Sequence, residues 1–150
     1  RVGRGVYLHP DARLDGDVGF QIASAKLGPD AAIGGLSALY HYDLAEQIPA
    51  QTWVVVPAEK RTRVEGYRLI RTKTRLDKEI IQQNGYRIVS VERAVLEALK
   101  YITKIGERTA IRAAREALAQ KKTTEIKLAN AAKELGLGAV LAKYLEVIAP

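Results

Sequence analysis

The stretch IIQQNGYRIV, in the middle of the chain, carries the strongest local signal for structure in this sequence. Asn84 and Gly85 tolerate the positive φ angles of a type I′ turn, which is a preferred connection between two antiparallel strands. The pattern therefore predicts a tight hairpin between Ile80–Gln83 and Tyr86–Val89.

Two segments before this hairpin also have the composition of strands. TWVVVP, residues 52–57, is a β-rich run that predicts a buried strand, and GYRLIRT, residues 66–72, alternates along its length. The charged segment EKRTRVEG between them is expected to be a hairpin loop. Near the start of the chain, Arg4–His9 has the composition of another strand, which Pro10 ends.

Short helices are expected among these strands. Asp17 is suited to cap a helix that ends at Gly28, and LSALYHYDL, residues 36–44, fits a second one. The expected inward positions of the first helix are Phe20, Ala23 and Leu27.

After Ser90 the pattern becomes helical and remains so to the end of the chain. Ser90 is a favourable N-cap, and Glu92 lies in the positive first turn of the helix that follows. Gly106 separates this helix from one near 107–119, and Thr123 or Thr124 is expected to cap a third. A last helix follows the glycines at 136 and 138. The predicted buried stripe of the first of these helices is Val91, Val95, Leu99 and Ile102.

These elements predict an α+β fold rather than regular βαβ alternation. We expect a small mixed or antiparallel sheet with short helices over residues 11–90, and a bundle of about four helices over residues 91–150. The length of 150 residues fits one domain.

Composition excludes several classes of site. The chain has no Cys, which removes disulfides, thiolate zinc sites and thiol nucleophiles, and fits a reducing cytoplasm. No apolar run reaches the length of a membrane span, so we expect a soluble intracellular protein.

The two histidines of the chain, His9 and His41, are far apart in sequence. Gly34 and Gly35 precede a helix without the spacing of a phosphate-binding loop. We therefore expect no cofactor, no metal and no enzymatic activity.

The net charge of +7 is concentrated in one stretch. Two acidic residues, Glu65 and Asp77, lie between Lys60 and Lys78, and Tyr67 is interleaved. A basic hairpin of this kind can lie along a phosphate backbone. It can equally be an edge strand that is charged to prevent aggregation. The basic residues of the stretch are Lys60, Arg61, Arg63, Arg68, Arg71, Lys73, Arg75 and Lys78.

A second basic surface is expected on the helix near 107–119. Arg108, Arg112 and Arg115 fall on one stripe of that helix. Glu116 is placed to pair with Arg112. The stripe is either a solvated face or a contact for a partner or RNA.

A metal-dependent nuclease is an alternative that the sequence leaves open. Such sites use an Asp and a Glu-x-Lys pair to hold a divalent cation. The nearest matches are Asp77-Lys78-Glu79 and Glu125-Ile126-Lys127, and neither has a partner carboxylate at a suitable position.

The order of motifs resembles the C-terminal domain of the AbiEi-type antitoxins of the AbiE abortive-infection systems, also called type IV toxin–antitoxin systems. The resemblance covers nearly the whole chain and rests on order and spacing. The segments that carry it are RGVY (4–7), Ser37-Ala38-Leu39, Ile48-Pro49, TWVVVP, the basic segment, and Val89-Ser90-Val91-Glu92-Arg93-Ala94-Val95-Leu96. Glu97 stands where the family often has an Asp.

The resemblance implies a cytoplasmic bacterial or archaeal antitoxin that counters a nucleotidyltransferase toxin, without a necessarily stable complex. It also implies a regulator of its own operon, whose DNA-binding winged-helix domain precedes the RGVY segment. The chain begins at Arg1 and contains no Met. We therefore expect residues 1–10 to be the end of that domain or a linker. A DNA-binding accessory module of a transcriptional regulator is the alternative function.

Overall fold

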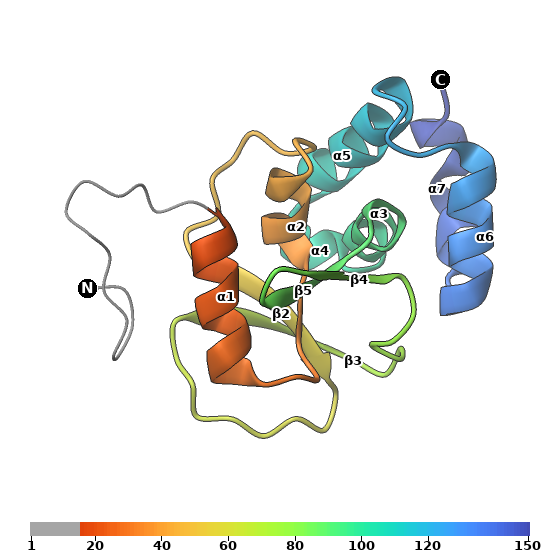
Figure 1. Ribbon diagram of the computed structural model, residues 1–150. Coiled ribbons are helices and arrows are strands. Elements are labelled where there is room, and N and C mark those ends of the chain that lie inside the picture. Colours follow the sequence, from red (N-terminus) through yellow and green to blue (C-terminus); the bar gives the residue numbers. More distant parts are fainter. Residues whose placement is uncertain (1–15) are drawn as a thin grey trace.

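The fold consists of a five-stranded mixed sheet and the helices that pack on it (Figure 1). The computed structural model describes residues 16–150. The strand order is β3-β2-β1-β5-β4. The α+β prediction is confirmed, whereas the strand predicted at Arg4–His9 lies outside the described residues. The strands are β1 (Ala32–Ile33), β2 (Thr52–Pro57), β3 (Tyr67–Thr72), β4 (Ile80–Gln83) and β5 (Tyr86–Val89). The helices are α1 (Gly16–Leu27), α2 (Gly35–His41), α3 (Val91–Lys100), α4 (Ile102–Ile105), α5 (Glu107–Ala119), α6 (Glu125–Leu135) and α7 (Gly138–Ile148).

The predicted hairpin is present, with a different turn. β4 and β5 pair antiparallel, with Gln83 opposite Tyr86. Gly85 has φ +84°, but Asn84 is not among the non-glycine residues of positive φ in the described part of the chain. A positive φ at the second turn residue alone is the pattern of a type II turn, so the type I′ prediction was wrong.

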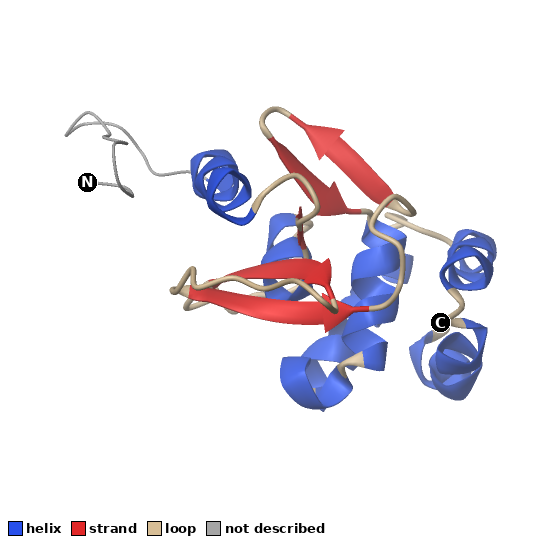
Figure 2. Ribbon diagram, turned by 90° about the horizontal axis from the view of Figure 1, so that it is seen from below, coloured by secondary structure: helices blue, strands red, loops and turns tan. Residues whose placement is uncertain are grey.

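β2 and β3 are parallel, so the charged segment between them is not the predicted hairpin loop. Residues 58–66 instead cross from the end of β2 back to the start of β3. Figure 2 shows this connection running in front of the two strands. Val64 of the connection packs against the core, and Val54 and Val56 of β2 are buried. The connection therefore covers part of the sheet, as a crossover helix does in most parallel pairs.

The start of α2 lies close against β2. A Cβ atom at Gly34 would lie 2.4 Å from Val55 Cγ2, and one at Gly35, whose φ is +52°, would lie 2.6 Å from the Trp53 ring. The Ser37 hydroxyl accepts a hydrogen bond of 2.8 Å from the Trp53 amide. The two glycines are thus explained by close packing of a helix on a strand.

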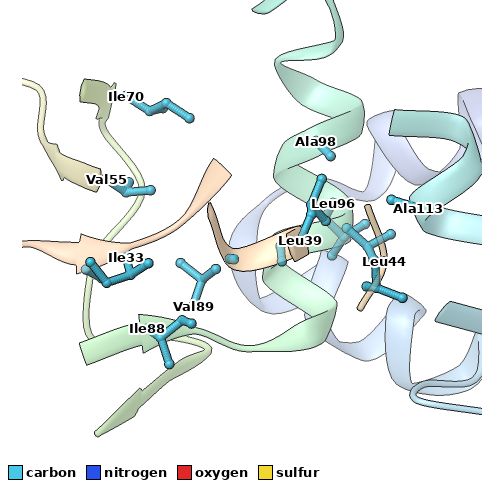
Figure 3. Packing of buried hydrophobic residues seen from close by; sticks show 14 of the residues in the cluster. Ile33, Leu39, Leu44, Val55, Ile70, Ile88, Val89, Leu96, Ala98 and Ala113 are labelled. Atoms are coloured by element: carbon cyan, nitrogen blue, oxygen red, sulfur yellow. The ribbon is translucent and has the colours of Figure 1, made fainter. Parts of the chain in front are cut away.

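Helix α3 is the centre of the core. Ser90 caps it as predicted, with its hydroxyl accepting from the Arg93 amide at 3.0 Å. The predicted stripe is too narrow, because Arg93 through Leu99 are all buried and the helix ends at Lys100, so that Ile102 belongs to α4. Figure 3 shows Leu96 of α3 beside Leu39 of α2, with Val89 further toward the sheet. One buried cluster therefore joins the sheet to the C-terminal helices.

The remaining helix ends follow their local signals. Thr124 caps α6 and accepts from the Lys127 amide at 3.1 Å, and Gly136 ends α6 in the left-handed conformation. Asp17 lies inside the first turn of α1 rather than before it, and its carboxylate accepts a 2.7 Å hydrogen bond from the Tyr86 hydroxyl. No helix within residues 16–150 has the length and apolar character needed to cross a bilayer.

Tyr42 ties the segment after α2 to the end of β5. Its hydroxyl donates a 2.7 Å hydrogen bond to the Val89 carbonyl, next to the cap of α3. Burial, with a smaller effect of Glu92, raises the pKa of Tyr42 to about 12. A tyrosine with a raised pKa stabilises the fold while it is protonated, because the folded state holds its proton more tightly than the unfolded chain.

We predict that Tyr42 stabilises the fold below pH 10 and that this contribution is lost as the pH rises from about 10 to about 12. Tyr42→Phe removes one hydrogen bond, so the free energy of unfolding at pH 7 falls by about 1 kcal/mol. The variant also loses the absorbance component at 295 nm that titrates near pH 12. Tyr40→Phe, at a neighbouring side chain that is 41% exposed, is the control and leaves both unchanged. Identical titrations of wild type and Tyr42→Phe would contradict the assignment.

Candidate nucleic-acid interface

Residues 58–66, which connect β2 to β3 and are called the crossover segment here, present part of the predicted basic surface to solvent. Its side chains alternate, with Arg61 and Arg63 exposed and Thr62 and Val64 partly buried. An extended chain places neighbouring side chains on opposite sides, so packing of Val64 on the core directs the two arginines outward. Neither arginine has a hydrogen bond or ion pair to any residue in the described part of the chain.

Lys60 and Arg71 hold the start of this segment in place rather than facing solvent freely. The Lys60 ammonium lies 2.8 Å from Asp30 Oδ1, and the Arg71 guanidinium donates a hydrogen bond to the Lys60 carbonyl. These interactions fix the crossover against β3 and the end of α1. Lys60 and Arg71 therefore position the segment on which Arg61 and Arg63 are exposed.

Strand β3 carries its two arginines on opposite faces. Arg68 shares a face with Ile70 and Thr72, both buried, and its guanidinium lies 5.3 Å from the centroid of the Trp53 ring. Arg71 shares the other face with Tyr67, whose pKa is raised by burial and over whose ring Lys26 lies at 6.0 Å. The basic surface thus wraps around an edge strand.

The turn between β3 and β4 carries the last predicted cations. Lys73 is exposed and has no partner among residues 16–150, whereas Arg75 forms an ion pair with Asp77. Arg93 of α3 holds the backbone of this turn. Its Nη1 donates to the carbonyls of Arg75 and Lys78, at 2.7 and 2.8 Å.

Arg93 itself is completely buried. Its Nε lies 3.1 Å from Glu97 Oε2, one turn further along α3. Burial raises the pKa of Glu97, and the charge of Arg93 opposes that shift. This pair was not predicted from the sequence, although opposite charges at i and i+4 beside the predicted apolar stripe are a signal for it.

The structure therefore brings most of the predicted site together. We call the following set the basic edge: Lys60, Arg61, Arg63, Arg68, Arg71, Lys73 and Arg75. All of them lie on β3 or on the segments that enter and leave it.

The arginine stripe of α5 is not part of the basic edge. α5 and β3 lie on opposite sides of the molecule in Figure 1. Arg112 pairs with Glu46 at 2.8 Å rather than with Glu116, so the predicted pairing was wrong; Glu116 instead accepts from the Gln120 side chain. Arg115 donates to the Val147 carbonyl at 2.8 Å. Arg108 is exposed beside a shallow pocket that Arg112 also lines.

The acidic residues considered for a nuclease are held in separate places. Asp77 pairs with Arg75, and Glu79 accepts a 2.8 Å hydrogen bond from the Ser90 hydroxyl. Glu125 and Lys127 are exposed in the first turn of α6. Within residues 16–150, no three Asp, Glu or His side chains are grouped closely enough to hold a metal ion.

A groove lies beside the basic edge, with a volume of about 450 Å³. Residues from four segments that are distant in the sequence line it. One of them is Arg87 of β5, which was not among the predicted site residues. The lining residues are Asp30, Pro57, Glu59, Thr72, Lys73, Thr74, Arg75, Leu76, Asp77 and Arg87.

Comparison with known proteins identifies no family for this chain. No protein-family model matches the sequence, and no curated protein matches it significantly.

Proposed function

We propose that this chain is a non-enzymatic antitoxin and regulatory domain of the AbiEi type, which contacts nucleic acid through the basic edge. The observation that carries the proposal is the gathering of seven predicted cations around β3. Only Lys60 and Arg75 of this set are paired with an acidic side chain among the described residues. Three of the others, Arg61, Arg63 and Lys73, are exposed and have no hydrogen bond or ion pair there. Guanidinium and ammonium groups left free on one surface can bind phosphates and release the counterions of a nucleic acid.

The antitoxin part of the proposal rests on the motif order in the sequence. Its partners would be operator DNA or RNA, and functionally a nucleotidyltransferase toxin in the cytoplasm. In the Ser90–Leu96 motif, Ser90 caps α3 and Arg93 anchors the turn below the basic edge. Residues of that motif thus act structurally, and the contact with a partner is assigned to the exposed cations.

The basic edge is favoured over the α5 stripe because it presents three exposed cations without a partner among the described residues, whereas Arg108 is the one such cation among the three arginines of the stripe. Arg112 and Arg115 are already engaged within the chain. Protection of an edge strand against aggregation is the competing explanation for the charges on β3. The two explanations differ in what they predict for the salt dependence of binding.

We predict that binding of this chain to duplex DNA weakens steeply with salt and that the basic edge causes most of this dependence. In Arg61→Ala/Arg63→Ala/Arg68→Ala/Arg71→Ala, the slope of log K against log salt flattens by about 0.9 for each phosphate that the variant no longer neutralises. Fluorescence anisotropy between roughly 50 and 200 mM KCl measures the slope, with duplex DNA and single-stranded RNA as probes.

The matched control removes four exposed lysines from α3, α6 and α7: Lys100, Lys127, Lys133 and Lys143. Its slope should remain close to that of the wild type. Because Arg71 also fixes the crossover, thermal melting checks the fold, and the triple variant that keeps Arg71 provides a second comparison. An unchanged slope in both basic-edge variants would assign these charges to edge protection.

We predict that co-expression of this chain restores growth to cells that produce a nucleotidyltransferase toxin encoded beside its gene. The basic-edge variant should restore less growth at equal soluble protein level, because it binds nucleic acid more weakly. Growth curves after toxin induction measure the effect. If the folded wild-type chain leaves the cells dying at the rate of the empty vector, the antitoxin role is wrong. Full rescue by the variant would separate antitoxin action from the basic edge.

A further inference from the structure

The groove beside the basic edge lies where open sheets commonly bind ligands. Pro57 and Thr72 are the last residues of the parallel strands β2 and β3, and both line the groove. Ligands of open α/β sheets bind outside the carboxyl ends of such strands. The volume of about 450 Å³ is within the usual range for sites that hold small molecules.

The charges that line the groove are unequally engaged. Of its three carboxylates, Asp30 is paired with Lys60 at 2.8 Å and Asp77 with Arg75. Glu59, the third, has no partner in the part of the chain that the structure describes.

Two cations of the groove remain able to bind an anion. Lys73 is exposed and unpaired among the described residues. Arg87 is partly buried, and its Nη1 donates to the Pro29 carbonyl at 2.6 Å. This hydrogen bond orients the guanidinium and leaves its other N–H groups available.

The wall that carries Lys73 is built on a fixed backbone. The Thr74 amide donates to the Thr72 hydroxyl at 3.0 Å, and Thr72 is buried. Arg93 holds the carbonyls of Arg75 and Lys78 from below. A site whose cations stand on a fixed turn loses little conformational freedom when it binds.

We propose that this groove binds a ligand of nucleotide size through its phosphate group. Lys73 and Arg87 contact the phosphate, and Glu59 accepts hydrogen bonds from hydroxyl or amino groups of the same ligand. The phosphate belongs either to a free mononucleotide or to the terminal nucleotide of a nucleic acid. The proposal goes beyond the proposed function and does not depend on it.

Isothermal titration calorimetry with AMP, GMP, CMP, UMP, adenosine and inorganic phosphate tests the proposal. At least one mononucleotide should bind saturably with one site per chain, and adenosine should bind at least about tenfold more weakly. The loss of one charge-assisted hydrogen bond corresponds to a change of about tenfold or more. Lys73→Gln should therefore weaken mononucleotide binding about tenfold, and Lys73→Gln/Arg87→Gln should weaken it further.

The matched control is Arg61→Gln/Arg63→Gln, which removes two positive charges outside the groove. This control should change mononucleotide affinity by less than about threefold, and it should flatten the salt dependence of DNA binding. In contrast, Lys73→Gln/Arg87→Gln should weaken mononucleotide binding more than it weakens DNA binding. This contrast separates failure of the groove from failure of the basic edge. If Arg87→Gln lowers the melting temperature, Lys73→Gln alone decides, since the Lys73 side chain has no hydrogen bond or ion pair within residues 16–150.

Two further probes identify the source of the phosphate. The probes are an oligonucleotide with a 5′-phosphate and the same oligonucleotide with a 5′-hydroxyl, each competing with the mononucleotide. Stronger competition by the 5′-phosphate form indicates that the ligand is a nucleic-acid end. Equal, weak competition by both forms indicates that the ligand is a free nucleotide. Absence of saturable binding for every mononucleotide and for the 5′-phosphate oligonucleotide would overturn the proposal. Equal weakening in the two double variants would also overturn it, because general attraction to positive charge would then explain the binding.

Discussion

The buried contact between Arg93 and the turn after β3 is the interaction on which the rest of this structure depends. It joins the central helix to the backbone that carries Lys73 and Arg75. Arg93 also forms a buried ion pair with Glu97. Burial of such a pair is costly, and Arg93 Nη2 and Glu97 Oε1 have no hydrogen-bond partner among the described residues. The ion pair therefore contributes little net stability, and the role of Arg93 is to fix the position of the turn.

The parallel pairing of β2 and β3 has an equally direct effect on the surface. Because the strands run the same way, the chain between them has to return along the sheet, and Val64 packs on the core as it does so. Arg61 and Arg63 are thereby exposed next to β3, and the carboxyl ends of both strands reach the groove. The parallel direction of β2 and β3 thus accounts for both the basic edge and the groove beside it.

Much of the secondary structure was predictable because its signals are local. Ser90 and Thr124 cap helices through their own hydroxyls, and the Asn84-Gly85 turn joins adjacent strands. The direction of β3 was not predictable from its composition, since pairing depends on residues far along the chain. The basic edge was visible as a run of charge. Arg87 and Arg93 were missed, because the hydrogen bonds that give them roles come from Pro29 and from the turn at 75–78.

Hydrogen exchange in Arg93→Lys tests most directly whether the interior fixes the basic edge. Lysine keeps the charge but places all donors on one nitrogen, so it cannot reproduce the fork that holds two carbonyls and Glu97. The amides of Thr74 and Ser90, bonded to Thr72 Oγ1 and the Glu79 carbonyl, report on the two ends of the turn. We expect both to exchange at least about tenfold faster while the amides of α7 keep their rates. Unchanged exchange at Thr74 and Ser90, or equal acceleration throughout residues 16–150, would contradict the account.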